Sequence, residues 1–382
     1  MSFILSVKNK FKFLWIRIVA PAILNSIFLF SRRNKKRLLV IKTDGIGDYI
    51  LFRNYLQFLK SSDKYKDHSI YLLTNTANKD FAISMDAKFV DGFFCYADGY
   101  FLKWKLVGLL YRLQQLKVST IIYPNYSRKY PVDWLVGHVR ATHKIGLDGD
   151  TMNEPLPLKL KGDKFFTQLI KPKDGAPHEF DRNKQIFEEI TGQKCDFKKP
   201  FINKDGLNIL PSDSVVIFPG GSEGSKRWPP ANFSQLCKQI ISELKTPIIL
   251  TGGKDEIEIG NEISKNIPAN NVSNKINALS LVELCSVIGS AKLLISNDSV
   301  AIHIGVALDI PVIAISKGDI YGRFIPYPAH IYKQLENITP PGFHPGADKY
   351  TQWSSSNIND IRVEDVFNTA QRSLNNKKVE SA

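Results

Sequence analysis

Residues 293–316, LLISNDSVAIHIGVALDIPVIAIS, indicate the fold of this 382-residue chain. Two apolar runs flank a short polar turn and an apolar helical segment, the pattern of two buried parallel strands joined by a helix. In the turn, Asp298 precedes Ser299, whose hydroxyl is placed to cap the helix. The first N–H groups and the positive dipole end of this helix would then face an anionic ligand. His303 follows Ser299 by four residues, on the same helical face.

The same alternation extends through the rest of the chain. From residue 37 onward, short apolar runs alternate with amphipathic segments, which predicts βαβ units and parallel sheets. The expected strands are Leu38–Lys42, Ile70–Thr74, Phe93–Tyr96, Thr120–Tyr123, Val215–Phe218, Ile248–Thr251, Leu293–Ser296 and Val312–Ile315. Helices are expected at Tyr49–Leu59, at Lys103–Leu116 and in a segment that ends at Gly192. A polar stretch at 193–206 separates two Rossmann-like halves, whose ligands would bind beyond the carboxyl ends of the strands, at an interdomain cleft.

Composition narrows the class of partner. The formal net charge of +14 calls for an acidic partner: nucleic acid, an anionic membrane surface or a phosphorylated substrate. Nucleic acid is disfavoured, because no recognition helix, zinc finger or aromatic platform interrupts the α/β pattern. The four cysteines are far apart and form no C-x-x-C pair, so neither a zinc site nor a disulfide framework is indicated. A reducing, cytoplasmic location fits best.

The first 36 residues have a different character. Ile18–Ser31 is uncharged over 14 residues, shorter than the about 20 that span a bilayer. Basic residues flank it: Lys8, Lys10, Lys12, Arg32, Arg33, Lys35, Lys36 and Arg37. This pattern predicts a segment that lies on an anionic membrane surface through residues 8–37. A cleaved signal peptide is disfavoured because Arg17 interrupts the apolar run, whereas a helix packed on the domain is the alternative.

The first strand leads into IKTDGIGDYILF, residues 41–52. Gly45 and Gly47 permit a tight turn, and Asp48 stands at the start of the following helix. The segment is not a dinucleotide fingerprint, because Ile50 takes the place of the third glycine in G-x-G-x-x-G. Asp48 is therefore either a helix cap or a carboxylate that deprotonates a hydroxyl.

Two loops in the second half have features of anion and nucleoside sites. In VVIFPGGSEGSKRWPPANF, residues 215–233, Gly221 and Ser222 bring backbone N–H groups close to an oxyanion and Lys226 supplies a positive charge. Its spacing is not that of a Walker A loop. In IILTGGKDEIEIGNEI, residues 248–263, Asp255 could bind ribose hydroxyls; for Glu256 a favourable interaction with the helix dipole is preferred.

These loops, together with the 298–303 turn, resemble glycosyltransferase family 9, the ADP-heptose:lipopolysaccharide heptosyltransferases and their relatives. The motifs that resemble it are KTDGIGD, PGGSEGSKRWP, TGGKDE and SNDSVAIHIGVALDIPVIAI, in the family's order, over about residues 37 to 370. The resemblance implies a GT-B architecture of two Rossmann-like domains. It further implies an N-terminal acceptor domain at 37–195, a nucleotide-sugar domain at 196–353, and a C-terminal segment at 354–382 whose helix crosses back to the first domain.

The resemblance also implies roles for individual residues. Asp48 would be the general base of an inverting transfer. The donor would be held by Gly221, Ser222, Lys226, Asp255, Asp298, Ser299 and His303, with Glu256 as the alternative to Asp255. No metal and no cofactor would be needed, since a helix N-terminus and a lysine stabilise the departing diphosphate. The donor would be a nucleotide sugar, with ADP-heptose as one candidate. The acceptor would be a glycolipid or glycan such as lipopolysaccharide core, at the inner face of the cytoplasmic membrane.

Three observations leave alternatives open. Asp148 and Asp150 have the D-x-D spacing of metal-dependent glycosyltransferases, but two carboxylates alone make a poor metal site. Val300 and Asn54 stand where the family usually has glycine and proline, and residues 317–328, KGDIYGRFIPYP, differ from its glycine-rich turn. The alternative functions are a nucleotide-binding scaffold that has lost activity and a GT-B nucleotide-sugar epimerase or hydrolase.

Overall fold

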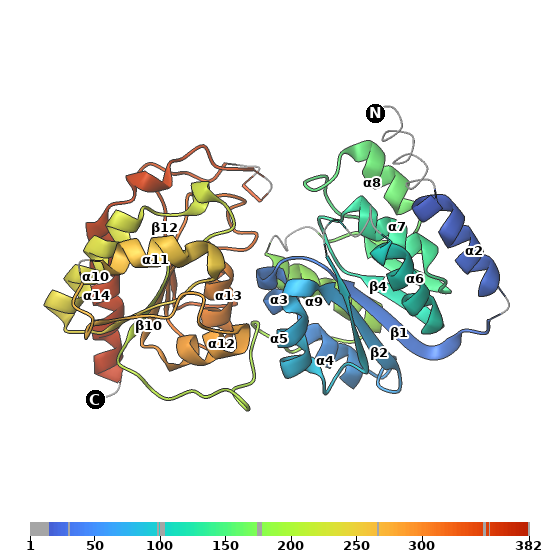
Figure 1. Cartoon of the computed structure of the whole chain (residues 1–382), viewed down its shortest axis with the longest axis horizontal. Helices are drawn as coiled ribbons and strands as arrows, with labels where there is room; N and C mark the ends of the chain where they lie inside the picture. Colours follow the sequence, from blue (N-terminus) through green and yellow to red (C-terminus); the bar gives the residue numbers. More distant parts are fainter. Residues whose placement is uncertain are drawn as a thin grey trace. The chain divides into compact units, whose positions relative to one another are not determined.

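The computed structural model describes residues 15–29, 31–97, 99, 104–173, 178–265, 267–346, 349–350 and 352–380. The chain divides into two compact units (Figure 1). Unit 1 comprises Met1–Gly45, Tyr55–Gly175 and Asn183–Cys195, and unit 2 comprises Ile46–Asn54, Ala176–Arg182 and Asp196–Ala382. The second unit therefore includes two short segments that precede residue 196 in the sequence.

Unit 1 contains a six-stranded sheet with the order β3-β2-β1-β4-β5-β6, in which every pair of neighbours is parallel. Its strands are β1 (Asn34–Lys42), β2 (Ser69–Asn75), β3 (Gly92–Tyr96), β4 (Val118–Tyr123), β5 (His143–Leu147) and β6 (Gln168–Ile170). The helices along this part of the chain are η1 (Trp15–Val19), α2 (Ala20–Ile27), α4 (Asn54–Ser61), η2 (Thr76–Asn78), α5 (Lys79–Asp86), α6 (Lys105–Gln115), α7 (Tyr130–His138), α8 (Leu156–Asp163) and α9 (Glu179–Thr191). The order is that of a dinucleotide-binding Rossmann sheet.

Unit 2 repeats this topology. Its all-parallel sheet has the order β12-β11-β10-β7-β8-β9. When β7 is taken as the first strand and the list is read from its other end, this order is the same as that of unit 1. The strands are β7 (Val215–Phe218), β8 (Ile248–Leu250), β9 (Val272–Asn274), β10 (Leu293–Asn297), β11 (Val312–Ile315) and β12 (Leu335–Ile338). The helices are α3 (Ile46–Phe52), η4 (Gly224–Lys226), α10 (Pro230–Leu244), η5 (Lys254–Glu256), α11 (Ile257–Ser264), α12 (Leu281–Ser290), α13 (Val300–Ala307), η6 (Ile358–Asp360) and α14 (Val363–Glu380).

The two sheets confirm the predicted α/β architecture. Strands β7 and β11 have the bounds that the apolar runs predict, because central parallel strands are buried on both faces. The strands that sequence reasoning missed are β5, β6, β9 and β12. Each lies toward an edge of its sheet, where polar residues replace part of the apolar run.

The helix expected at Tyr49–Leu59 is two helices, α3 and α4, which are separated at Arg53. The amide of Asn54 binds the backbone of Phe201 twice: its Oδ1 accepts from the Phe201 N–H at 2.9 Å, and its Nδ2 donates to the Phe201 carbonyl at 2.9 Å. Arg53 donates to the same carbonyl at 2.8 Å. This tertiary pairing is a contact that a helical periodicity does not reveal.

Helix α14 packs on unit 2. Its buried residues Val366, Phe367, Ala370 and Leu374 belong to the same core cluster as strands β7 and β10. The buried stripe at spacings of three and four residues explains this packing, because that face needs a partner and the second sheet provides one. The expectation that this helix crosses back to the first domain stays a prediction.

The N-terminal segment packs on unit 1 with one face and exposes the other. Ile16, Ala20 and Leu24 are buried, two of them in a core cluster shared with α6. Four apolar residues of the same segment are exposed: Ile18, Ile23, Ile27 and Leu29. Within the described residues, no helix is both long enough and apolar enough to cross a membrane. Lys8, Lys10 and Lys12 of the predicted membrane segment lie outside the described residues.

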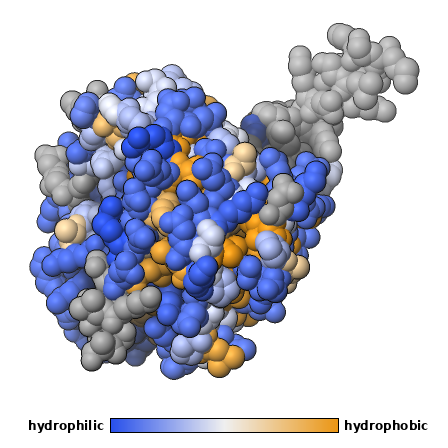
Figure 2. Space-filling view, turned by 90° about the vertical axis from the view of Figure 1, so that its left-hand side faces the viewer, coloured by the Kyte–Doolittle hydropathy of each residue, from blue (hydrophilic) through white to orange (hydrophobic). Residues whose placement is uncertain are grey.

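The surface drawn in Figure 2 is largely hydrophilic, and hydrophilic residues interrupt its apolar areas. In unit 2, large apolar side chains such as Leu210, Ile257 and Trp353 are exposed singly. Scattered apolar residues of this kind are normal on a folded protein.

Candidate functional site

The turn between β10 and α13 is built as its sequence predicts. Ser299 is the N-cap of α13, and its Oγ accepts a hydrogen bond from the Ala301 N–H at 3.3 Å. The Ser296 hydroxyl lies 2.9 Å from the Ser299 hydroxyl and fixes its position. Val300 is the first helical residue. Helix α13 therefore begins with an ordered cap, and its first turn presents backbone N–H groups and a positive dipole end.

The loop after β7 is attached to this turn through Asn297, a residue that sequence reasoning did not select. The Asn297 amide is fully buried, donates to the Pro219 carbonyl at 2.7 Å and accepts from the Trp228 N–H at 3.2 Å. Trp228 is anchored in turn, because its indole donates to the Ile361 carbonyl at 3.0 Å. The signal in the sequence is a polar residue at the end of an apolar strand, which must find partners when buried.

Lys226 is the cation of this loop. It ends the short helix η4, and its Nζ lies 3.6 Å from Asp298 Oδ2. The same ammonium lies 5.1 Å from the ring centroid of Trp353, a cation–π arrangement. The structure thus brings together Lys226 and Asp298, which the sequence predicted as donor-site residues from two different loops. Gly221 is half-buried beside them, and the Ser222 side chain is exposed at the loop surface.

Asp298 is held in a low-polarity environment. Burial raises the pKa of its carboxyl group, the Lys226 ammonium opposes this shift, and the negative charge of Asp319 adds to it. Asp319 is itself buried, accepts from the Ser354 N–H at 2.8 Å and lies 3.4 Å from Lys317 Nζ. Each of the two carboxylates therefore has its own lysine beside it, Lys226 for Asp298 and Lys317 for Asp319.

Asp255 and Glu256, the two candidates for ribose binding, lie in the loop after β8 and differ in their surroundings. Glu256 is buried, and its carboxylate accepts from the Gly253 N–H at 2.8 Å and from Arg227 at 3.2 Å. Arg227 also donates to the Gly221 carbonyl at 2.8 Å. Glu256 therefore joins two loops, whereas Asp255 is exposed at the loop surface.

His303 lies at the point where α3 packs against α13. A Cβ atom added to Gly47 would lie 2.8 Å from His303 Cδ2, so only glycine fits there without a displacement. The Nδ1 of His303 is 2.7 Å from the Tyr327 hydroxyl. Burial, together with a smaller contribution from His178, lowers the pKa of His303 to about 3. The imidazole is therefore neutral at physiological pH.

Asp48 is the residue after Gly47 and lies in the first turn of α3. The approach of Gly47 to His303 places the start of α3 beside α13, more than 250 residues away in the sequence. His178 supports the same region: its Nδ1 accepts from the Phe180 N–H at 3.2 Å, and its ring lies 4.5 Å from that of Tyr327. Burial lowers the pKa of His178 to about 4.

The two carboxylates with D-x-D spacing in unit 1, Asp148 and Asp150, contact different partners. Asp148 Oδ1 lies 2.6 Å from Lys159 Nζ, and Asp150 accepts from the Ser127 hydroxyl at 3.0 Å. In the part of the chain that the structure describes, no group of three or more His, Cys, Asp or Glu is placed to hold a metal ion.

Comparison with known proteins adds to this geometry. A family model described as glycosyltransferase family 9 (heptosyltransferase) matches residues 132–332, just over half of the chain. The chain belongs to glycosyltransferase family 9. Its matched region includes the loops after β7, β8 and β10 and the whole of α13. The KTDGIGD motif lies outside the match.

Among curated family 9 relatives, lipopolysaccharide heptosyltransferase 2 of Salmonella typhimurium is 31% identical over 134 residues, which cover 34% of this chain and 37% of the relative. Lipooligosaccharide heptosyltransferase 2 of Campylobacter jejuni is 34% identical over 125 residues, covering 32% and 38%. The alignments thus span little more than a third of each relative.

Solved structures show that the fold of this family 9 chain is shared along most of its length. A family 9 glycosyltransferase of Veillonella parvula superposes with a TM-score of 0.68 at 15% identity, covering 89% of this chain and 97% of the other. The Escherichia coli heptosyltransferase WaaC with ADP-2-deoxy-2-fluoro heptose gives 0.68 at 17% identity, covering 88% and 99%. Both have the GT-B fold that the resemblance implies.

Proposed function

We propose that this protein is an inverting glycosyltransferase that moves a sugar from a nucleoside diphosphate donor to a hydroxyl group of a glycolipid or glycan. The observation that carries the proposal is the approach of Gly47 to His303, because it places the helix start bearing Asp48 beside the α13 turn. Membership of family 9 supports it. ADP-heptose is the first donor to test, since a solved relative holds a fluorinated ADP-heptose, and lipopolysaccharide core is the first acceptor.

The donor diphosphate would lie between the β7 loop and the start of α13. Lys226, Gly221 and Ser222 would contact its oxygens, together with the N–H groups beyond the Ser299 cap. The charge that develops on the departing diphosphate is stabilised by this cation and by the helix dipole, which is the work that a metal ion does in other transferases. We therefore propose a reaction that needs neither a metal nor a cofactor.

Asp298, Ser299 and His303 would face the sugar side of the donor, and Asp255 the ribose. When Nδ1 of His303 accepts from Tyr327, its Nε2 carries the hydrogen and can donate to a ligand oxygen. Gly47 supports this role, because a Cβ there would lie 3.3 Å from Nε2 and cover it. Asp255 is proposed over Glu256, which already holds Gly253 and Arg227.

In the reaction itself, Asp48 would accept the proton of the acceptor hydroxyl as its oxygen attacks the anomeric carbon. The bond between that carbon and the diphosphate oxygen breaks, and the electron pair goes to the diphosphate. Attack from the face opposite the leaving group inverts the anomeric configuration.

The first experiment measures transfer by mass spectrometry with ADP-heptose and a lipopolysaccharide core acceptor. Asp48→Asn should lower kcat by about 10²–10⁴-fold while ADP affinity measured by calorimetry stays unchanged. Asp205→Asn, an exposed carboxylate in a unit 2 loop, is the matched control. Full turnover of Asp48→Asn would contradict the assignment of the base, and wild-type protein that forms no product with any nucleotide sugar would contradict transfer.

We infer further that the protein works on the inner face of the cytoplasmic membrane, held there peripherally. The apolar residues Ile18, Ile23, Ile27 and Leu29 are exposed, and the exposed cations Arg32, Arg33, Lys35 and Lys36 follow them in the sequence; together they would give this segment an apolar surface beside positive charge. Such a surface inserts shallowly into an anionic leaflet. Arg32→Glu/Arg33→Glu should weaken binding to phosphatidylglycerol vesicles by about tenfold or more, at about 1 kcal/mol per cation.

Co-sedimentation with these vesicles measures that binding. Lys204→Glu/Lys238→Glu, two exposed lysines of unit 2, is the charge-matched control and should bind as the wild type does. Equal loss in both variants would show that net charge, rather than the N-terminal surface, governs membrane association.

A further inference from the structure

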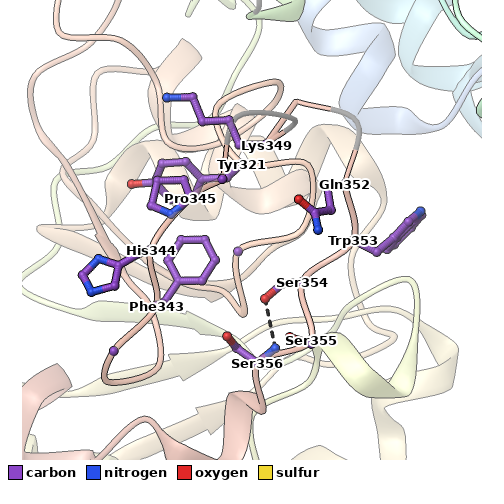
Figure 3. Close-up of a pocket in the computed structure, with 13 residues that line it drawn as sticks. Tyr321, Phe343, His344, Pro345, Lys349, Gln352, Trp353, Ser354, Ser355 and Ser356 are labelled. Carbon is purple, nitrogen blue, oxygen red and sulfur yellow. Dashed lines mark hydrogen bonds between the residues drawn. The ribbon is translucent and has the colours of Figure 1, made fainter.

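Unit 2 contains a pocket that the proposed roles do not use. It has a volume of about 260 Å³, slightly below the range of about 300–1,000 Å³ that is usual for small-molecule sites, and it lies among the segments that follow β11 and β12 (Figure 3). Its lining residues are Gly318, Tyr321, Gly342, Phe343, His344, Pro345, Gly346, Lys349, Gln352, Trp353, Ser354, Ser355 and Ser356. Gly318 and Tyr321 belong to the 317–328 segment, in which the sequence departs from the pattern of family 9.

One wall of the pocket is aromatic and held in place. The rings of Tyr321 and Phe343 lie 5.2 Å apart and are tilted at 47°. Gly318 has φ of +89°, and any Cβ there would collide with the Phe343 ring. Phe343 therefore packs directly on the backbone, and Figure 3 shows His344 and Pro345 beside it. This wall offers ring faces and apolar edges to a ligand.

The facing wall is polar. Figure 3 shows Gln352 and the serines at 354 and 356 opposite the aromatic side chains. Two hydrogen bonds of the backbone hold residues 352–354: the Ser354 N–H donates to Asp319 at 2.8 Å, and the Gln352 carbonyl accepts from the Ile320 N–H at 2.9 Å. An amide and several hydroxyls thus supply both donors and acceptors on one side of the pocket.

The polar wall adjoins the proposed diphosphate site. Trp353 lies between Gln352 and Ser354, and its ring is 5.1 Å from Lys226 Nζ. In Figure 3 this ring points away from the serines. Asp319, which holds the Ser354 N–H, contributes to the electrostatic environment of Asp298. A group bound in the pocket would therefore be a near neighbour of a diphosphate held by Lys226.

We propose that this pocket binds a sugar ring. A sugar presents C–H faces that pack on aromatic rings and a rim of hydroxyls that both donate and accept, which matches the two walls. That the bound ring would lie next to a diphosphate rests on the proposed function, which assigns the diphosphate to Lys226. The match between the two walls and a sugar ring does not depend on that function. The ring has two possible sources, the sugar of the donor and a sugar unit of the acceptor glycan.

Saturation-transfer NMR tests the pocket without requiring transfer. The probes are the methyl glycosides of heptose, glucose, galactose and N-acetylglucosamine, added singly to the full chain. Ser355→Trp places a large ring at the polar wall and should abolish the signal of whichever glycoside binds, and Gln352→Ala should weaken it. Ser242→Trp, at an exposed serine on α10, is the matched control and should leave the signal intact. Absence of signal in the wild type, or an equal signal in Ser355→Trp, would overturn the proposal.

Calorimetry then distinguishes the sources. When the ring belongs to the donor, Ser355→Trp weakens binding of ADP-heptose and leaves ADP unaffected. When it belongs to the acceptor, both affinities are unchanged and the KM for the acceptor rises in the transfer assay. A chain that binds glycosides in this pocket but forms no product would overturn the proposed transferase function while upholding the sugar site.

Discussion

In each sheet, a carboxylate and a cation lie beside each other after the fourth strand of the unit. Asp133, after β4, is buried, whereas Asp298, after β10, is half-buried, and the two pairs also differ in how completely the cation is enclosed. After β4, Arg128 lies 3.7 Å from Asp133, also contacts Asp163, and has its guanidinium 4.6 Å from the Phe166 ring centroid. After β10, Asp298 lies 3.6 Å from Lys226, which reaches it from another loop. The side chain of Arg128 is 4% exposed and that of Lys226 is 13% exposed.

This difference separates a structural cation from a cation available to a ligand. The Arg128 guanidinium is enclosed by two carboxylates and a ring, so removing it leaves buried negative charge. The Lys226 ammonium is a point charge on a flexible stem at a loop surface, and it can move from Asp298 to an incoming anion with little rearrangement. A buried ion pair by itself therefore does not identify a site.

The largest expected effect comes from exchanging each cation for methionine. Arg128→Met should lower the free energy of unfolding by about 3–5 kcal/mol, because Asp133 and Asp163 lose their compensating charge. Lys226→Met should change it by less than about 1 kcal/mol but weaken ADP binding by about tenfold or more. Urea denaturation and calorimetry measure the two quantities. Similar losses of stability in both variants would contradict the distinction between a structural cation and a cation that is available to a ligand.

The next effect concerns pH. Burial raises the pKa of Asp133 to about 7, with Arg128 opposing and Asp163 adding to the shift. Since the folded protein binds this proton more tightly than the unfolded chain, the contribution of Asp133 to stability is present below pH 4 and is lost as the pH rises toward 7. Relative to the wild type, the free energy of unfolding of Asp133→Asn should therefore rise by about 3 kcal/mol between pH 4 and pH 7.

Denaturation at several pH values tests this expectation, with Asp205→Asn as a control whose carboxylate is exposed. A difference between Asp133→Asn and the wild type that stays constant with pH would show that Asp133 is ionised throughout. The ion pairs of Arg128 and Lys226 would then differ only in how completely the cation is enclosed.

The smallest effect is expected in unit 2, where burial keeps His303 and His178 neutral. The pKa of His303 lies near 3, below its value in the unfolded chain, so its contribution to stability is present above about pH 6.5 and is lost as the pH falls. Tyr327→Phe removes the hydroxyl that binds Nδ1 and should cost about 1 kcal/mol. Denaturation measures this cost, which should be equal at pH 8 and pH 5 because His303 is neutral at both; a loss that differs between the two values would argue against a neutral His303 held by Tyr327.

The candidate site was predictable from sequence to the extent that it depends on local chemistry. A serine before an apolar helical segment predicted the cap at Ser299, and glycine-rich turns after buried strands predicted where Lys226 and Asp255 lie. Asn297 and Tyr327 were missed, because their importance comes from partners far along the chain. The break between α3 and α4 was also missed, and the backbone of Phe201 that Asn54 binds there lies far along the chain.

The sequence by itself determined the central parallel strands and the turns that end them, and its motifs carried the resemblance to family 9. The strands and turns depend on burial periodicity, capping and turn residues, all of which act within a few positions. Only the tertiary structure decided that Gly47 meets His303, that Lys226 meets Asp298, and that α14 covers the second sheet. Such contacts follow from how apolar faces pack and which buried polar groups find partners, and residues distant in sequence settle both.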